Sequence, residues 1–353
     1  MYRFENIQLM LDTDTAALLL HTPHCRYLTG LDYTDGGVLL TQDTAYLLTD
    51  SRYIEAAEEL PHGMQCIACN GLFSTVNDLL HKHGATRLLT EQTLSLSAYQ
   101  KLTDTLSVTV CADGSLDAAL DAARLLKDES EIALLTRAQA ITEAGFDHIL
   151  PYIKAGVTER DIALELEFFM RKNGAHGVSF DLIVVSGENG SRPHGVPTDK
   201  HIQNGEFVTL DFGALYHGYH ADMTRTVAVG YVTDKQKHIY DTVLAAQQAA
   251  LSVLKAGITG KAADAAARDV ITKAGFGAYF GHGTGHGVGV EIHEAPTLSP
   301  RAEEMPLPAG CVVTVEPGIY VPQQCGVRIE DMVLLTDDGI KNFTKAAKDL
   351  LIL

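Results

Sequence analysis

The sequence predicts an α+β protein with a smaller N-terminal α/β domain, residues 1–120, and a larger C-terminal domain, residues 121–353. Two observations predict this division. Short apolar runs alternate with helical spacings up to about residue 117, and beyond that point the chain repeats its own motifs about 100 residues later. Such a repeat predicts two pseudo-symmetric halves, each a helical stretch followed by a hairpin, with one face of each sheet buried against the other half.

The N-terminal domain shows the periods of both strands and helices. Residues 38–40, 46–48 and 88–90 are typical of strands, whereas residues 54–60 and 97–106 have helical spacing. The chain has 6 scattered cysteines, which indicates reduced thiols rather than a disulfide framework. Cys66 and Cys69 have the spacing of half a zinc site, but no second pair completes it.

The C-terminal domain opens with an amphipathic helix expected from Glu129. Two motifs then recur 101 residues later: Lys154-Ala-Gly-Val-Thr158 as Lys255-Ala-Gly-Ile-Thr259, and Lys172-Asn-Gly174 as Lys273-Ala-Gly275. Threonine is a common N-cap and glycine commonly follows a helix C-terminus. Each motif pair therefore predicts one helix in each half.

The hairpins place carboxylates at corresponding positions of the two halves. Residues 205–213 recur as residues 310–318, which aligns Asp211 with Glu316. A turn at residues 216–218 would bring Asp222 opposite Asp211, and a turn at residues 322–324 would bring Glu330 opposite Glu316. We therefore expect two directly opposed carboxylate pairs.

Four convergent carboxylates need positive charge nearby. Their flanks are apolar, which predicts burial, and like charges repel more strongly when buried. Arg225 and Arg328 could offset only part of this charge, so we predict a two-metal site completed by the imidazole of His286. Such an oxygen-rich set favours Mn²⁺, Co²⁺ or Fe²⁺ over a soft-ligand zinc site. The alternative to a metal site is a set of solvated acids at strand ends. Asp211-Phe-Gly213 also matches a triplet found in protein kinases, but no other kinase motif accompanies it.

His286 lies in a glycine-rich stretch from Gly281 to Glu294. If this stretch is extended, glycines occupy one face and His282, Thr284 and His286 the other, so a backbone or a ligand is expected to approach the glycine face closely. A flexible loop is the alternative. A nucleotide-binding loop is not favoured, because the stretch lacks Gly-x-Gly-x-x-Gly.

The composition narrows the partners. A formal net charge of −18 argues against nucleic acid or an anionic membrane as the main partner. No window approaches the roughly 18 apolar residues of a membrane helix, and the first residues lack the apolar core of a signal peptide. We therefore expect a cytoplasmic protein.

These residues resemble the pita-bread metallopeptidases, the family of aminopeptidase P, prolidase, methionine aminopeptidase and the metal-free creatinase. In the C-terminal domain the resemblance rests on residues 282–294, on Glu316-Pro-Gly-Ile-Tyr320 and on Val327-Arg-Ile-Glu-Asp331. Tyr27-Leu-Thr-Gly30 and Leu48-Thr-Asp-Ser-Arg-Tyr53 are similar to the creatinase/prolidase N-terminal domain. The resemblance covers the whole chain and implies a pita-bread fold for the C-terminal domain.

The resemblance also implies a site and a mechanism. It implies two divalent ions, with Mn²⁺ first and Co²⁺, Fe²⁺ or Zn²⁺ as alternatives. Asp222 and Glu330 would bridge the two ions. The implied ligands are the same five residues that the hairpin argument reached: Asp211, Asp222, His286, Glu316 and Glu330. A hydroxide between the ions would attack an Xaa-Pro bond, with Glu316 as the proton shuttle. The implied helpers are His194 near the scissile bond, His282 and His293 at the substrate and oxyanion, and Arg328 beside a ligand carboxylate.

The expected activity is that of an aminopeptidase P-like enzyme acting on proline-containing peptides, as a homodimer. Dipeptidase members carry an arginine where this chain has Thr297, and Arg301 is the nearest candidate, which disfavours a strict Xaa-Pro dipeptidase. A metal-free creatinase-type amidinohydrolase and a non-catalytic binding protein are further alternatives. The complete set of five ligands opposes both.

Overall fold

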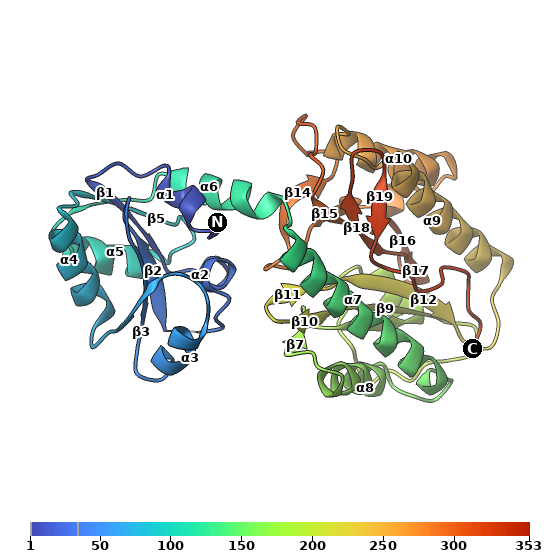
Figure 1. Ribbon diagram of the computed structural model, residues 1–353. Helices are drawn as coiled ribbons and strands as arrows, with labels where there is room; N and C mark the ends of the chain where they lie inside the picture. Colours follow the sequence, from blue (N-terminus) through green and yellow to red (C-terminus); the bar gives the residue numbers. More distant parts are fainter. Residues whose placement is uncertain (1, 34) are drawn as a thin grey trace. The chain divides into compact units, whose positions relative to one another are not determined.

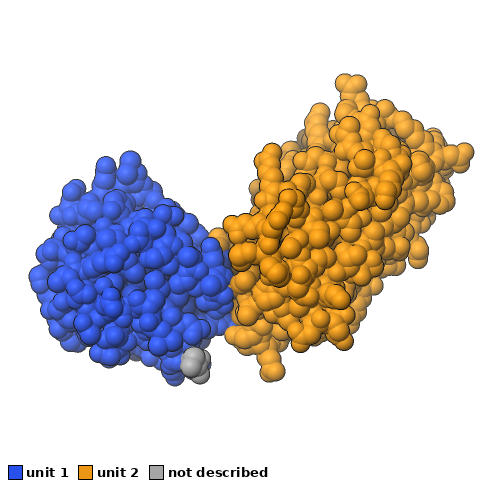
Figure 2. All heavy atoms as spheres, turned by 90° about the horizontal axis from the view of Figure 1, so that it is seen from above, with its two compact units in different colours: residues 1–124 blue, residues 125–353 orange. Residues whose placement is uncertain are grey.

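A computed structural model describes residues 2–33 and 35–353. The chain forms two compact units, residues 1–124 and 125–353 (Figure 2). The division falls at the end of helix α6 (Ser115–Leu125), and the predicted boundary between residues 120 and 121 lies within the same helix. None of the helices in the described residues is long and apolar enough to span a membrane.

The N-terminal unit contains a mixed six-stranded sheet in the order β4-β3-β2-β1-β5-β6 (Figure 1). β1 pairs antiparallel with β2 and parallel with β5, which makes it a central strand. The strands are β1 Thr15–Leu19, β2 Gly36–Leu40, β3 Ala45–Thr49, β4 Gln65–Ala68, β5 Arg87–Thr90 and β6 Thr109–Cys111. The other helices are α1 Glu5–Gln8, α2 Thr22–Thr29, α3 Ile54–Glu59, α4 Leu72–His83 and α5 Leu96–Thr105.

The core of this unit lies where Leu18, Leu39 and Leu48 of the sheet meet Leu80 of α4 and Leu102 of α5. The three predicted strands and the two predicted helices are confirmed within two residues at each end. The sequence reasoning missed β1, whose five residues are all buried. β3 is equally buried and was predicted from its apolar run, so burial alone does not explain why β1 was missed.

The C-terminal unit has the predicted two halves. Figure 1 shows α7 and α8 on one side of its strands and α9 and α10 on the other. The first half contains α7 Glu129–Ile149, α8 Glu159–Lys172, β7 Gly177–Val178, β8 Ile183–Ser186, β9 Phe207–Phe212, β10 Ala214–Tyr216, β11 Tyr219–His220 and β12 Met223–Ala228. The second contains α9 Asp234–Val253, α10 Gly260–Lys273, β13 Gly285–Gly287, β14 Glu294–Leu298, β15 Val312–Val315, β16 Gly318–Val321, β17 Cys325–Arg328, β18 Asp331–Leu335 and β19 Ile340–Asn342. Short 3₁₀ turns follow α7 (Leu150–Tyr152), β8 (Gly187–Ser191) and α10 (Gly277–Tyr279).

The repeat appears in both the helices and the sheets. α8 and α10 each have 14 residues, and the side chains of Thr158 and Thr259 cap their N-termini, as predicted. β8, β9 and β12 form one antiparallel sheet, and β13, β15 and β18 form the corresponding part of the other. Each half has its own apolar core, so the two sheets hold the hairpin carboxylates on well-packed strands.

Candidate metal centre

The first hairpin supplies Asp211 on β9 and Asp222 just before β12. Its register differs from the prediction, because Asp211 faces Thr224 rather than Asp222. The turn lies at His217 and Gly218, both with positive φ, and the hairpin is therefore shifted by one residue on each strand. Asp211 and Asp222 remain on the same face of the sheet, as diagonal neighbours rather than an opposed pair.

The second hairpin supplies Glu316 just after β15 and Glu330 just before β18. Val315 pairs with Asp331, so the next pair outward is Glu316 with Glu330, as the sequence predicts. The backbone N–H of Glu330 donates to the carbonyl of Thr224 at 3.1 Å. This bond joins the second hairpin to the first, so the two carboxylate sources share one framework.

His286 lies on β13, in the glycine-rich stretch. The predicted long strand is limited here to the three residues Gly285–Gly287, with a bulge after His286. The predicted close approach is confirmed: a Cβ at Gly285 would lie 1.9 Å from the carbonyl oxygen of Thr314, and one at Gly287 2.2 Å from that of Ala295. The glycines therefore allow neighbouring backbone to pack against the strand that carries His286.

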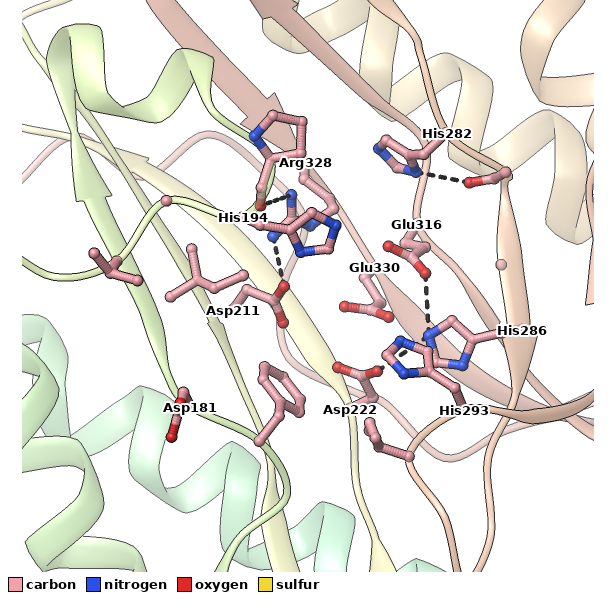
Figure 3. Close-up of a pocket in the computed structure, with 18 residues that line it drawn as sticks. Asp181, His194, Asp211, Asp222, His282, His286, His293, Glu316, Arg328 and Glu330 are labelled. Atoms are coloured by element: carbon pink, nitrogen blue, oxygen red, sulfur yellow. Dashed lines mark hydrogen bonds and ion pairs between the residues drawn. The ribbon is translucent and has the colours of Figure 1, made fainter. Parts of the chain in front are cut away.

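The five side chains point into one space (Figure 3). Nε2 of His286 lies 3.3 Å from Glu316 Oε1 and 3.5 Å from Asp222 Oδ2. Asp222, His286 and Glu330 each offer a ligand atom, and these three atoms lie within 4.8 Å of one another. Such a set has the donor chemistry for hard divalent cations.

Two carboxylate oxygens in this cluster lack partners. In the part of the chain that the structure describes, Asp211 Oδ1 and Glu330 Oε1 are buried and accept no hydrogen bond. A buried unpaired acceptor costs free energy, and a buried unpaired charge costs more. Bound cations would satisfy both atoms, so the residues present fit a metal centre.

The carboxylates differ in their electrostatics. Burial, and then the neighbouring carboxylates, raises the pKa of Asp222 and that of Glu330 well above their usual values. For Glu316 burial acts in the same direction, but the hydrogen bond and charge of His286 prevail and bring its pKa to about 2. The pKa of His286 is raised, because its carboxylate neighbours outweigh its burial. Without a cation the cluster therefore favours partial protonation.

Arg328 provides positive charge beside the cluster. Its buried guanidinium donates to Asp211 Oδ2, to the Tyr320 hydroxyl at 2.8 Å and to Thr224 Oγ1 at 3.0 Å. Arg225, the other arginine considered from sequence, instead forms an ion pair with Asp331 at 2.9 Å. Of these two arginines, Arg328 is therefore the one that contacts a side chain of the cluster.

The three predicted helper histidines lie around the same pocket (Figure 3). Both nitrogens of His282 are engaged, Nδ1 with the Gly283 carbonyl at 2.7 Å and Nε2 with the Tyr320 hydroxyl at 2.8 Å. His293 packs edge-on against His286, with ring centroids 4.3 Å apart. His194 is exposed and lies on the loop after β8.

The pocket has a volume of about 450 Å³, within the range of small-ligand sites. One wall is the carboxylate cluster, and the others include apolar side chains, which are those of Phe180, Ile183, Pro193, Val196 and Ile292. Among the described residues that line it, Arg328 is the one arginine, and its guanidinium is already bound within the protein. The pocket thus has an acidic floor and apolar walls, a form that suits a short peptide.

Sequence reasoning missed two supporting residues. Tyr320 links His282 to Arg328 through its hydroxyl, and its place in the Glu316-Pro-Gly-Ile-Tyr320 motif was the available signal. Asp264 on α10 is buried and accepts from the Thr284 N–H at 3.1 Å and from its hydroxyl at 2.9 Å. No sequence signal separated Asp264 from an ordinary helical acid.

Comparisons with known proteins agree on one family. The sequence profile of metallopeptidase family M24 matches residues 133–337, and that of the creatinase/prolidase N-terminal domain matches residues 8–126. The solved structure of an Xaa-Pro dipeptidase from Bacillus anthracis is 44% identical, covers 99% of each chain and has a TM-score of 0.95. An X-Pro aminopeptidase structure from Thermotoga maritima is 34% identical, with 98% and 97% covered and a TM-score of 0.89. An Xaa-Pro dipeptidase of Pyrococcus horikoshii is 36% identical over 95% of this chain and 94% of its own.

Proposed function

The chain belongs to metallopeptidase family M24 and has its pita-bread fold, and on that premise we propose that it hydrolyses the Xaa-Pro bond of short peptides. The observation that carries this proposal is the convergence of four carboxylates and one imidazole; two buried oxygens of these carboxylates have no hydrogen-bond partner among the described residues. The ligand set would be the one expected from sequence: Asp211, Asp222, His286, Glu316 and Glu330. Two divalent ions suit five such ligands, and Mn²⁺ suits their oxygen-rich chemistry.

The bound ions would acidify a water molecule and polarise the scissile carbonyl. The residues of the chain would supply the remaining functions. Glu316, at the cluster edge beside His286, would carry a proton to the leaving nitrogen. Arg328 would orient Asp211 and favour its ionised form, against the burial that raises the pKa of this carboxyl group.

The helper histidines would divide the substrate contacts. The pKa of His293 is lowered, chiefly by partial burial, so the neutral ring can donate one hydrogen bond toward the developing oxyanion. His282 has both nitrogens engaged within the protein, so it would pack its ring against the substrate rather than donate to it. His194, on its exposed loop, is free to approach the substrate near the scissile bond.

Dipeptides are the substrates we place first. The names of the Bacillus anthracis and Pyrococcus horikoshii relatives support this choice over the aminopeptidase expected from sequence. The second candidate, cleavage of longer Xaa-Pro peptides, is supported by the absence of an uncommitted arginine among the described residues lining the pocket, since such a group would grip the carboxylate of a dipeptide. The Thermotoga maritima relative is named for this activity.

One experiment separates these functions. The Mn²⁺-loaded protein is given matched Xaa-Pro dipeptides and Xaa-Pro-Yaa tripeptides, and kcat/KM is measured for each. Cleavage of dipeptides alone is the expected result; comparable cleavage of tripeptides would establish the aminopeptidase instead. Failure to cleave either class, with no response to added metal, would overturn the proposal. Creatine turnover without metal would point to an amidinohydrolase.

A further inference from the structure

The loop that carries His194 is held by a buried carboxylate outside the metal centre. Glu159, the first residue of α8, is fully buried. Its Oε1 accepts from the Ser186 N–H at 2.7 Å and from the Ser186 hydroxyl at 2.9 Å. Its Oε2 accepts from the Thr198 hydroxyl at 2.6 Å and from the Thr198 N–H at 3.1 Å. One carboxylate thus binds Ser186 and Thr198, the two residues that flank the loop 187–197.

The same carboxylate also reaches inside the loop. The side-chain amide of Asn189 lies 3.2 Å from each oxygen of Glu159. Hydrogen bonds to an ionised acceptor are stronger than those between neutral groups, particularly in a buried setting. The five donor groups that Glu159 accepts from all lie in the loop or beside its ends, and Lys200 adds one further hydrogen bond to the Ser186 hydroxyl at 2.8 Å. Glu159 is therefore the group that connects both ends of the loop with its interior.

His194 depends on that course for its position. In the part of the chain that the structure describes, no residue forms a hydrogen bond with its imidazole. The neighbouring carbonyl of Pro193 accepts from Arg328 at 3.3 Å, which ties the loop to the metal centre on one side. Glu159 ties it to α8 on the other side. The backbone, rather than a side-chain partner, therefore sets where the His194 ring meets the pocket.

The internal repeat indicates that Glu159 serves this loop and not the helix start. The corresponding first residue of α10 is Gly260, although both helices are capped by threonine in the same way. A Cβ at Gly260 would lie 2.1 Å from the carbonyl oxygen of Thr297, so the second half has no room for a side chain there. The capped helix start therefore does not require an acid, and the acid occurs in the half that carries the His194 loop.

We propose that Glu159 is a positioning residue, which fixes the 187–197 loop so that His194 meets the substrate of the proposed Xaa-Pro peptidase. The proposal rests on the proposed function for its kinetic consequence. Its structural consequence, the order of the loop, does not depend on the proposed function.

The kinetic test is a double-mutant cycle between Glu159→Gln and His194→Ala. The glutamine keeps the size of the side chain but turns an NH₂ toward the donors of Ser186 or Thr198. We expect Glu159→Gln alone to lower kcat/KM by about 10- to 100-fold, the cost of misplacing a site residue, with unchanged metal content. In the His194→Ala background it should lower kcat/KM by less than about twofold, because the group that it positions is gone. An equal factor in both backgrounds would overturn the proposal.

Milder variants cover the case in which Glu159→Gln folds poorly. Thr198→Val removes the 2.6 Å hydroxyl donor and should give a smaller loss with the same dependence on His194, whereas Thr198→Ser should keep wild-type activity. The matched control is Glu165→Gln. Glu165 lies on the same helix and binds His148 at 2.6 Å, away from the loop, so kcat/KM should not change.

Amide hydrogen exchange separates this proposal from the proposed function. Residues 187–198 should exchange faster in Glu159→Gln than in the wild type or in Glu165→Gln, whether or not the protein cleaves Xaa-Pro peptides. If no such peptide is cleaved but exchange rises, the proposed function fails and Glu159 still orders the loop. Unchanged exchange in this segment would refute the positioning role directly.

Discussion

Replacing Glu330 by glutamine should stabilise the metal-free protein. Glu330 is 1% exposed, its Oε1 has no partner among the described residues, and its pKa is raised because burial and the neighbouring carboxylates disfavour its charge. Glutamine removes this charge. It also keeps an oxygen that can accept the 2.7 Å hydrogen bond from Thr224. The change therefore removes repulsion without leaving Thr224 unpaired.

The magnitude follows from the geometry of the cluster. The ligand atoms of Asp222 and Glu330 lie within 4.8 Å of each other, and two unit charges at that distance interact by roughly 3 kcal/mol at an effective dielectric constant of about 20. Partial protonation of the pair reduces the gain. We expect the metal-free variant to be about 1–3 kcal/mol more stable at neutral pH, which raises the melting temperature by roughly 3 to 10 °C in a domain of this size.

The assay is thermal unfolding in chelator at several pH values. A carboxylate whose folded-state pKa is raised destabilises the fold above that pKa, and stability returns as pH falls toward its unfolded value. The wild type should therefore gain stability from Glu330 and Asp222 as pH falls from about 8 to about 5, and the variant should gain less. Added Mn²⁺ should stabilise the wild type more than the variant, because the variant lacks a ligand.

The neighbouring acid provides a control of opposite sign. Asp331 is also fully buried, but Arg225, Lys348 and Asn342 all bind it, and its pKa is lowered despite its burial. Asp331→Asn should destabilise the protein by about 3–5 kcal/mol near neutral pH, because it leaves the buried guanidinium of Arg225 without its carboxylate counter-charge. If Glu330→Gln proves no more stable than the wild type in chelator, the inferred repulsion in the cluster is refuted.

Three further outcomes follow from the same geometry. Arg328→Met should lower kcat/KM at least about 100-fold and destabilise the fold by about 3–5 kcal/mol, since it leaves the Asp211 carboxylate buried without its counter-charge. Kinetics would measure the first effect and calorimetry the second. A variant with wild-type activity and stability would contradict this prediction. Gly285→Ala should displace the strand of His286 and lower the melting temperature, whereas Gly281→Ala should not, because a Cβ at Gly281 meets nothing within 4 Å; equal effects would refute the close-packing argument. Chelation should abolish activity and Mn²⁺ restore it, with an affinity that rises from about pH 5 to about pH 8 as protons leave the raised carboxylates; calorimetric titration that finds no dependence on pH would contradict it.

The repeat made the C-terminal architecture predictable. Helix caps such as Thr158 and Thr259 can be recognised from the local sequence alone. Because these motifs recur, they predict that the domain consists of two similar halves. In the N-terminal unit, strands such as β3 were found from their apolar runs, whereas β1 was not recognised. Both strands are buried along their whole length, so burial alone does not separate the strand that was predicted from the one that was missed.

The hairpin registers show where sequence reasoning about the site loses precision. Both turns were predicted by centring carboxylates on turn residues, which gave the second hairpin correctly and the first with a shift. In the first, Gly213 falls between β9 and β10, which belong to different sheets. The register is nevertheless the same in both sheets, since Phe212 pairs with Met223 and Leu215 with His220. The shift arises because the turn is centred one residue beyond the midpoint between Asp211 and Asp222. The predicted convergence of the five side chains is correct despite this shift, because a one-residue change on each strand keeps both acids on the same face of the sheet.

Buried carboxylates in the C-terminal unit differ in how their oxygens are satisfied, and this difference distinguishes two of the proposed ligands from two structural acids. Glu159 and Asp331 have hydrogen-bond donors for both oxygens, so their charge is satisfied by the protein alone. Asp211 and Glu330 each keep one buried oxygen without a partner among the described residues. The repeat pointed to the two proposed ligands because a shared metal centre needs ligands from both halves. It could not point to the structural acids, because an acid such as Glu159 serves one loop and is glycine in the other half. Finding such positioning acids therefore requires the donors around each carboxylate, which only the folded structure brings together.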